Sequence, residues 1–128
     1  MRALVFLFAL LAGCATGPQP ETPPVTEPTL PEVPERRESV AIAGLMESAR
    51  ADSAAGRLAN AAASLERALR IEPRNPRLWQ ELARVRLMQG EYAQAESLAA
   101  RSNSWAGSDS ALRAENQRLI EQARQAAR

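Results

Sequence analysis

The sequence contains no histidine, no lysine and a single cysteine, Cys14. A metal site built from histidine and cysteine is therefore excluded, and so is a serine or cysteine nucleophile that histidine activates. Without lysine, the chain can form neither a P-loop lysine contact nor a Schiff base. A hydrolase that uses carboxylates alone, such as a peptidoglycan lyase, is the remaining enzymatic alternative, and it would need a cleft. We expect a protein that is not an enzyme and binds neither a metal nor a cofactor.

Aromatic residues are also scarce, and the net charge is close to zero. The chain has two Trp, one Tyr and two Phe, and its sixteen basic residues stand against fifteen acidic ones. Proteins that bind nucleic acid use clustered basic residues for the phosphates and aromatic residues for the bases. We therefore expect no nucleic acid partner. A length of 128 residues leaves room for one modest domain.

The first fourteen residues have the pattern of an export signal. Arg2 precedes an apolar run from Ala3 to Ala12, far shorter than the ~20 residues that cross a bilayer as a helix. A charged start followed by a short apolar run is typical of a secretory signal peptide, which is removed from the mature protein.

The apolar run ends in Leu-Ala-Gly-Cys at residues 11–14, which resembles the lipobox of bacterial lipoproteins. The resemblance implies that residues 1–13 are removed and that Cys14 carries a covalent diacylglycerol on its sulfur and an N-acyl chain. Several acyl chains anchor a protein to a membrane where one chain does not. Ala15 stands where retention in the inner membrane of enteric bacteria would favour Asp, so the expected location is the periplasmic side of the outer membrane. The alternative is an ordinary signal peptide, or a buried helix with an incidental cysteine.

Residues 14–37 carry seven of the nine prolines, which are Pro18, Pro20, Pro23, Pro24, Pro28, Pro31 and Pro34. Proline lacks an amide donor and interrupts helices, and the segment has little apolar surface to bury. We expect a disordered, extended tether that spans about 70 Å over about 23 residues. A proline-rich recognition segment is the rival interpretation, although no PxxP flanked by basic residues stands out.

Residues 38–128 are rich in helix formers and lack the alternation that is typical of strands. We expect an all-α domain with helices at 39–54, 58–71, 76–89, 92–102 and 108–126. In the last of these, Ser108 or Asp109 would cap the helix, and one apolar face would be formed by Leu112, Leu119, Ile120 and Ala123.

Residues 42–75 and 76–109 align without a gap. The alignment pairs Leu45 with Trp79, Ala49 with Ala83, Gly56 with Gly90, Leu58 with Tyr92 and Ala61 with Ala95. This pattern resembles the tetratricopeptide repeat, which implies two helical hairpins and, at 108–126, a C-terminal capping helix. The second copy departs at Ser102 and Gly107, and the first at Ser48 and Asp52. Because stable arrays usually need three repeats, we expect either a moderately stable fold or cover by a partner or by a second copy in a homo-oligomer.

The resemblance also implies a groove that binds a segment of a partner protein. The family's groove positions fall on Ala43, Met46, Arg50, Ser53, Ala54, Arg77, Gln80, Arg84, Leu87 and Met88. Arginines beside methionines suit an acidic segment with apolar anchors. The alternative is a solvated face on which Arg84 pairs with Glu81, or Glu47 with Arg50.

Trp105 lies in the expected loop 103–107 before the capping helix. Tryptophan is over-represented at binding hot spots, so Trp105 is a candidate hot spot for a partner. The interpretation that we prefer is that it tucks against the helices of the second repeat, since the domain has few large apolar residues.

The order of lipobox, tether and small repeat domain resembles the outer-membrane lipoprotein activators of class A penicillin-binding proteins, in the form found in pseudomonads. The resemblance implies that the domain reaches from the outer membrane to a bifunctional penicillin-binding protein and activates it in peptidoglycan synthesis. Other periplasmic lipoproteins share this architecture, so a general scaffold or assembly factor of pilus or envelope biogenesis is the alternative.

Overall fold

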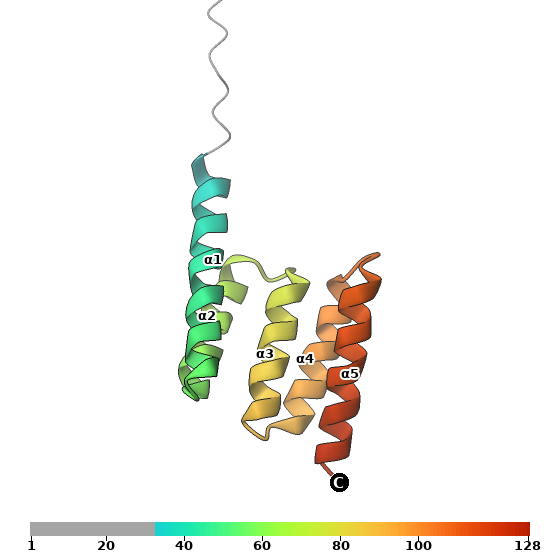
Figure 1. The fold of residues 1–128 in the computed structure, drawn as a ribbon. Coiled ribbons are helices and arrows are strands. Elements are labelled where there is room, and N and C mark those ends of the chain that lie inside the picture. The colour runs from blue at the N-terminus through green and yellow to red at the C-terminus, as the bar shows by residue number, and fades with distance from the viewer. Residues whose placement is uncertain (1–32) are drawn as a thin grey trace, which may run out of the picture.

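The computed structural model describes residues 33–128, which form five helices and no strand. The helices are α1 (Val33–Ala54), α2 (Leu58–Ile71), α3 (Pro76–Met88), α4 (Tyr92–Trp105) and α5 (Ser110–Ala126). Consecutive helices run antiparallel and pack in chain order (Figure 1). The prediction of two helical hairpins with a C-terminal capping helix is confirmed. The signal peptide, Cys14 and the tether as far as residue 32 lie outside the described residues.

Helix α1 begins at Val33, six residues before the predicted start at 39. The last residues of the predicted tether are therefore helical. Pro34 does not prevent this because it is the second residue of the helix, where the amide has no acceptor one turn earlier. From Glu35 onward the helix contains no further proline.

The other helices begin and end close to the predicted residues. Helix α2 has the predicted bounds, α3 ends one residue early and α4 continues for three more residues, to Trp105. The Asn75 side chain caps α3 by accepting a hydrogen bond from the Arg77 amide at 3.0 Å. Asp109 caps α5 by accepting one from the Leu112 amide at 3.0 Å, which fixes the start of this helix at Ser110.

Glycines end the first helix of each hairpin. Gly56 follows α1 with a φ of 74°, and Gly90 follows α3 with a φ of 79°. This left-handed conformation is costly for a residue with a Cβ and free of that cost for glycine. The two glycines aligned by the repeat therefore make the same turn.

Small residues let the helices of each hairpin approach closely. Ala61, Ala83 and Ala95 are completely buried at the positions that the repeat reserves for small side chains. Leu65 and Leu78 fill the space around them and are also buried. Each leucine stabilises the fold by about 1.5–3 kcal/mol through removal of its side chain from water.

When the alignment of the repeat is continued past residue 109 with the same spacing, residues of α5 align with those of α1 and α3. In α5 the positions of Ala49 and Leu45 are taken by Gln117 and Arg113, and both are exposed. These positions face the second helix of a hairpin in α1 and α3, and no second helix follows α5 in the described chain. The polar substitutions therefore close the array as an end cap must.

Candidate partner-binding site

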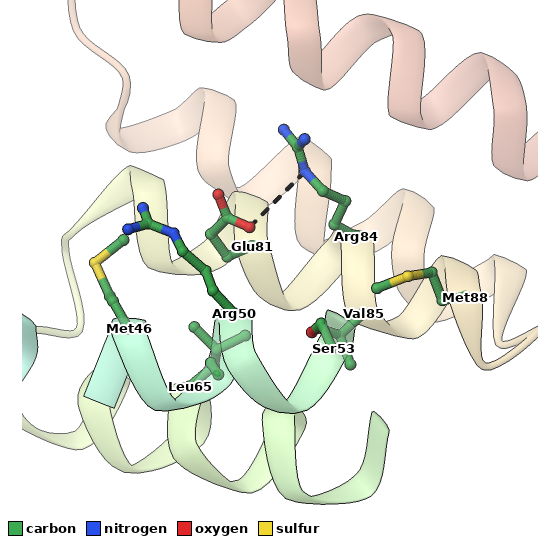
Figure 2. Close-up of a pocket in the computed structure, with 9 residues that line it drawn as sticks. Met46, Arg50, Ser53, Leu65, Glu81, Arg84, Val85 and Met88 are labelled. Carbon is green, nitrogen blue, oxygen red and sulfur yellow. Dashed lines mark ion pairs between the residues drawn. The ribbon is translucent and has the colours of Figure 1, made fainter. Parts of the chain in front are cut away.

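A groove lies between α1 and α3, with α2 beneath it (Figure 2). Its volume is about 140 Å³. The residues that line it are Met46, Ala49, Arg50, Ser53, Leu65, Glu81, Arg84, Val85 and Met88. Five of the residues predicted for a groove, including both methionines, are therefore brought together.

Two methionines mark the ends of the groove. Met46 of α1 and Met88 of α3 lie at opposite ends of it (Figure 2). The Met88 side chain is half-exposed, at 50%. Because methionine is unbranched and polarizable, it adapts to irregular apolar surfaces. The two side chains can each receive an apolar group of a bound segment.

The two arginines of the groove differ in their surroundings. Arg84 lies 3.3 Å from Glu115 of α5 and 3.9 Å from Glu81 of its own helix. Arg50 forms no ion pair with any residue between 39 and 128, the range over which side chains are described. The expected local pair of Arg84 and Glu81 is present, whereas the pair of Glu47 and Arg50 is not. Within that range, Arg50 is thus the cation of this groove that is open to an incoming carboxylate.

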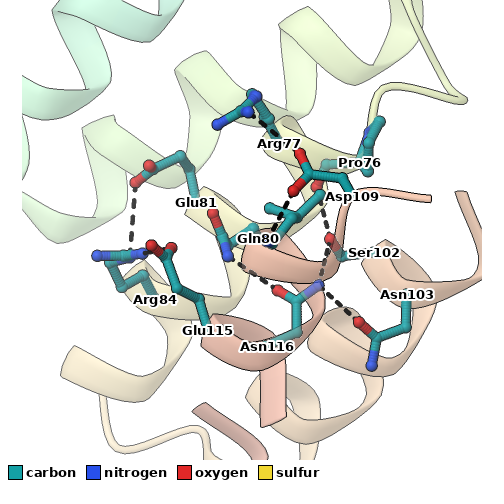
Figure 3. A network of polar contacts seen from close by, with 11 residues as sticks. Pro76, Arg77, Gln80, Glu81, Arg84, Ser102, Asn103, Asp109, Glu115 and Asn116 are labelled. Atoms are coloured by element: carbon teal, nitrogen blue, oxygen red, sulfur yellow. Dashed lines mark hydrogen bonds and ion pairs between the residues drawn. The ribbon is translucent and has the colours of Figure 1, made fainter. Parts of the chain in front are cut away.

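Arg77 and Gln80 were predicted for the groove, and the structure pairs Gln80 with α5 and Arg77 with the residue that caps α5 instead (Figure 3). Arg77 lies 3.3 Å from Asp109 at the start of that helix. Gln80 is 3% exposed and donates a hydrogen bond of 3.1 Å to Asn116. The groove therefore ends at α3, because α5 covers the other side of that helix.

A buried polar network joins α5 to the second hairpin (Figure 3). Asn116, which is fully buried, donates to Ser102 Oγ at 2.8 Å and to Asn103 Oδ1 at 2.9 Å. Ser102 Oγ in turn donates to the Pro76 carbonyl at 2.7 Å. Ser102 departs from the alanine of the repeat because α5 requires a polar partner there.

A charged pattern on the first helices was missed in the sequence. Glutamates recur at Glu47, Glu81 and Glu115, and arginines recur three residues later, at Arg50, Arg84 and Arg118. Each set repeats at the spacing of the two aligned copies, on α1, α3 and α5. Continuing the alignment past residue 109 would have found this pattern. It marks one face of the three helices with charges of both signs.

Trp105 is the last residue of α4, not part of a loop as predicted. Its side chain is 41% exposed, and the Arg74 guanidinium lies 5.3 Å from the centre of its ring. Trp105 is therefore not part of the buried core of the domain. It also lies outside the groove between α1 and α3.

The described part of the chain contains no cluster of acidic residues that could hold a metal ion. Across residues 33–128, no helix is both long and apolar enough to span a membrane.

The pKa of Arg124 is raised above its usual value because its guanidinium donates a hydrogen bond to the Glu96 carboxylate and is attracted by that charge. This pair joins α5 to α4.

Comparisons with known proteins agree with the geometry. Residues 53–115 match the family model of the tetratricopeptide repeat. The fold is similar to the solved structure of the globular C-terminal domain of P. aeruginosa LpoP, with a TM-score of 0.67 and 45% sequence identity. That similarity covers 68% of this chain and 82% of the LpoP chain. A comparison with curated proteins gave no match. The chain belongs to the family of LpoP-like tetratricopeptide-repeat proteins.

Proposed function

We propose that the chain is an outer-membrane lipoprotein whose repeat domain binds a class A penicillin-binding protein and activates it in peptidoglycan synthesis. The observation that carries this proposal is the 45% identity to the LpoP domain over 82% of that domain. The repeat fold itself is a protein-binding helical scaffold, since such arrays bind partners through extended surfaces. The domain acts on its partner by binding, without catalysis of its own.

The groove between α1 and α3 supports binding of a partner segment. Met46 and Met88 offer apolar contacts at its two ends, and Arg50 offers a cation that is not used by the described residues. Arginine binds a carboxylate through two parallel hydrogen bonds. The partner segment would carry an acidic residue between apolar ones.

The N-terminal region supports the same function. A lipid on Cys14 would hold one end of the protein at the outer membrane, and residues 14–32 would set how far the domain reaches. A partner in the inner membrane lies on the other side of the cell wall. A proline-rich tether separates the two ends of a protein more effectively than a flexible chain of equal length.

Purified mature protein without lipid should stimulate the glycan polymerisation of a class A penicillin-binding protein from the same envelope. Arg50→Gln and Met88→Ala should each weaken binding by about tenfold, which corresponds to an interface residue that contributes about 1.4 kcal/mol. Arg67→Gln is the matched control, because Arg67 is exposed on α2 outside the groove. Both groove residues are exposed enough for the fold to tolerate these changes.

The outcomes separate the function from the site. Absence of stimulation and of binding by the unmodified protein would refute the proposed function. Stimulation that Arg50→Gln and Met88→Ala leave unchanged would refute the groove alone. Recovery of pilus or envelope assembly proteins instead of a penicillin-binding protein would favour the alternative, a general periplasmic scaffold. Clearing of a peptidoglycan zymogram by the purified protein would refute the non-enzymatic role.

A further inference from the structure

A second surface lies where α2 passes into α3 and where α4 ends. We call it the indole patch, and its residues are Pro73, Arg74, Trp79, Arg101 and Trp105. The patch shares no residue with the groove between α1 and α3. It includes both tryptophans of the chain, although the domain has few large apolar residues. The proposed activation does not use it.

Three contacts hold the residues of the indole patch together. Arg101 lies over the Trp79 ring at 4.5 Å from its centre, and the Trp79 indole donates to the Pro73 carbonyl at 2.8 Å. The next residue, Arg74, lies 5.3 Å from the centre of the Trp105 ring. Arg101 and Trp105 are four residues apart on α4, hence on one face of that helix.

The indole patch has positive charge that its surroundings do not neutralise. Neither Arg74 nor Arg101 forms an ion pair within residues 39–128. The acidic neighbour Glu72 instead accepts a hydrogen bond from Asn75 at 2.7 Å. Both arginines and Trp105 are exposed. The patch therefore presents two cations beside aromatic surface, which suits an extended ligand that is both acidic and proline-rich.

We propose that the indole patch binds the proline-rich segment of the same chain, residues 16–32. This segment contains Glu21, Glu27 and Glu32, and no basic residue occurs between Arg2 and Arg36. Its charge is thus opposite to that of the patch. Proline-rich segments dock on exposed aromatic side chains because their extended backbone is already ordered before binding.

The segment is long enough to reach the patch. Helix α1 starts on the side of the bundle where α2 passes into α3 and α4 into α5, and its first turns project beyond that end (Figure 1). Residues 16–32 span about 50 Å when extended at ~3.1 Å per residue, against about 33 Å for the whole of α1. Because the segment is covalently attached, its effective concentration at the patch is in the millimolar range, so a weak contact suffices.

Docking shortens the reach of the protein. With the segment on the patch, the domain is held near its own N-terminal end. Release of the segment restores the full length of the tether. Binding and release of the segment at the indole patch thus change the distance that the tether can span. This role is independent of what the groove binds.

Paramagnetic broadening in NMR spectra tests the proposal on the mature chain. A nitroxide is placed on Thr26→Cys in a Cys14→Ser background, which leaves one thiol and removes the lipid. The two indole N–H signals, from Trp79 and Trp105, report on the patch. We expect both to lose intensity, while the Gly56 amide at the other end of the bundle keeps its own. Salt should restore both signals, since the Debye length falls from about 10 Å at 0.1 M to about 3 Å at 1 M.

Two double variants separate a specific site from general charge attraction. Arg74→Gln/Arg101→Gln should abolish the broadening. Arg67→Gln/Arg118→Gln removes the same charge from exposed arginines outside the patch and should leave it intact. Equal loss in both variants, or broadening spread evenly over the domain, would overturn the proposal. Broadening that appears only when spin-labelled and isotope-labelled chains are mixed would also overturn it, since the occupant would then belong to a second copy.

Discussion

Replacing Asn116 with leucine removes the polar centre of the contact between α5 and the second hairpin while keeping the branching and the number of heavy atoms of the side chain. Asn116 takes part in three hydrogen bonds, with Gln80, Ser102 and Asn103. Each contributes about 1 kcal/mol, and a buried Gln80 amide without a partner costs about 1–3 kcal/mol more. Burial of the leucine side chain offsets about 1.5–3 kcal/mol. We expect the free energy of unfolding to fall by about 1–4.5 kcal/mol.

Urea unfolding of the mature chain without lipid, followed by tryptophan fluorescence, measures this loss. Gln117→Leu is the matched control, because Gln117 is the next residue of α5 and is exposed. It should change the free energy of unfolding by less than about 0.5 kcal/mol. In the double variant Gln80→Leu/Asn116→Leu, the Gln80 amide that Asn116→Leu leaves without a partner is also removed. We expect the free energy of unfolding of this double variant to exceed that of Asn116→Leu by about 1–2 kcal/mol.

Two results would refute this reasoning. If Asn116→Leu were as stable as the parent protein, the hydrogen bonds would contribute nothing net beyond what leucine supplies. If the double variant lost the sum of the two single losses, the two amides would not depend on each other. Hydrogen exchange of the α5 amides would then show whether that helix is released on its own or unfolds with the domain.

Three further outcomes are expected. Gly90→Ala should destabilise the domain by about 1–2 kcal/mol in urea, because φ is 79° while the added Cβ meets only the Tyr92 hydroxyl, at 4.0 Å; an unchanged midpoint would contradict this. Arg86→Met should change the thermal unfolding free energy by less than about 1 kcal/mol, since losing the pairs with Glu66 and Glu91 is offset by removing a buried Nε without a partner; a loss above about 3 kcal/mol would contradict it. Deleting residues 22–26 should reduce activation in cells while leaving circular dichroism and membrane fractionation unchanged; full activation would show that tether length is irrelevant.

Most of the fold could be predicted because each copy of the repeat predicts the same pair of helices, so that α1 matches α3 and α2 matches α4. Helix α2 has the predicted bounds since Gly56 and Pro73 mark the turns on either side of it. The start of α1 was placed too late because prolines before Pro34 suggested an extended chain, and a proline in the first turn is compatible with either state.

The groove was only partly predictable because one repeat position has two environments. Met46 and Gln80 occupy the same position of the repeat, one facing α3 and the other facing α5. The family pattern assigns both to a groove. Only a contact between residues far apart in the sequence, here Gln80 with Asn116, shows that α5 packs against α3 and fills the space on that side of the helix. The space between α1 and α3 stays open as the groove.

If the groove binds a partner segment as proposed, the ion pair between Arg84 and Glu115 would limit which segments it accepts. A carboxylate that arrives at Arg84 must displace Glu115, so one ion pair is exchanged for another and little is gained. Arg50 has no such internal competitor among the described residues, and a carboxylate there adds a pair. The affinity for a ligand would then depend on its contacts with the methionines and Arg50. Arg84 would instead disfavour ligands whose carboxylate lies near it. A ligand whose acid lies too far toward α5 would break an existing contact without forming a better one.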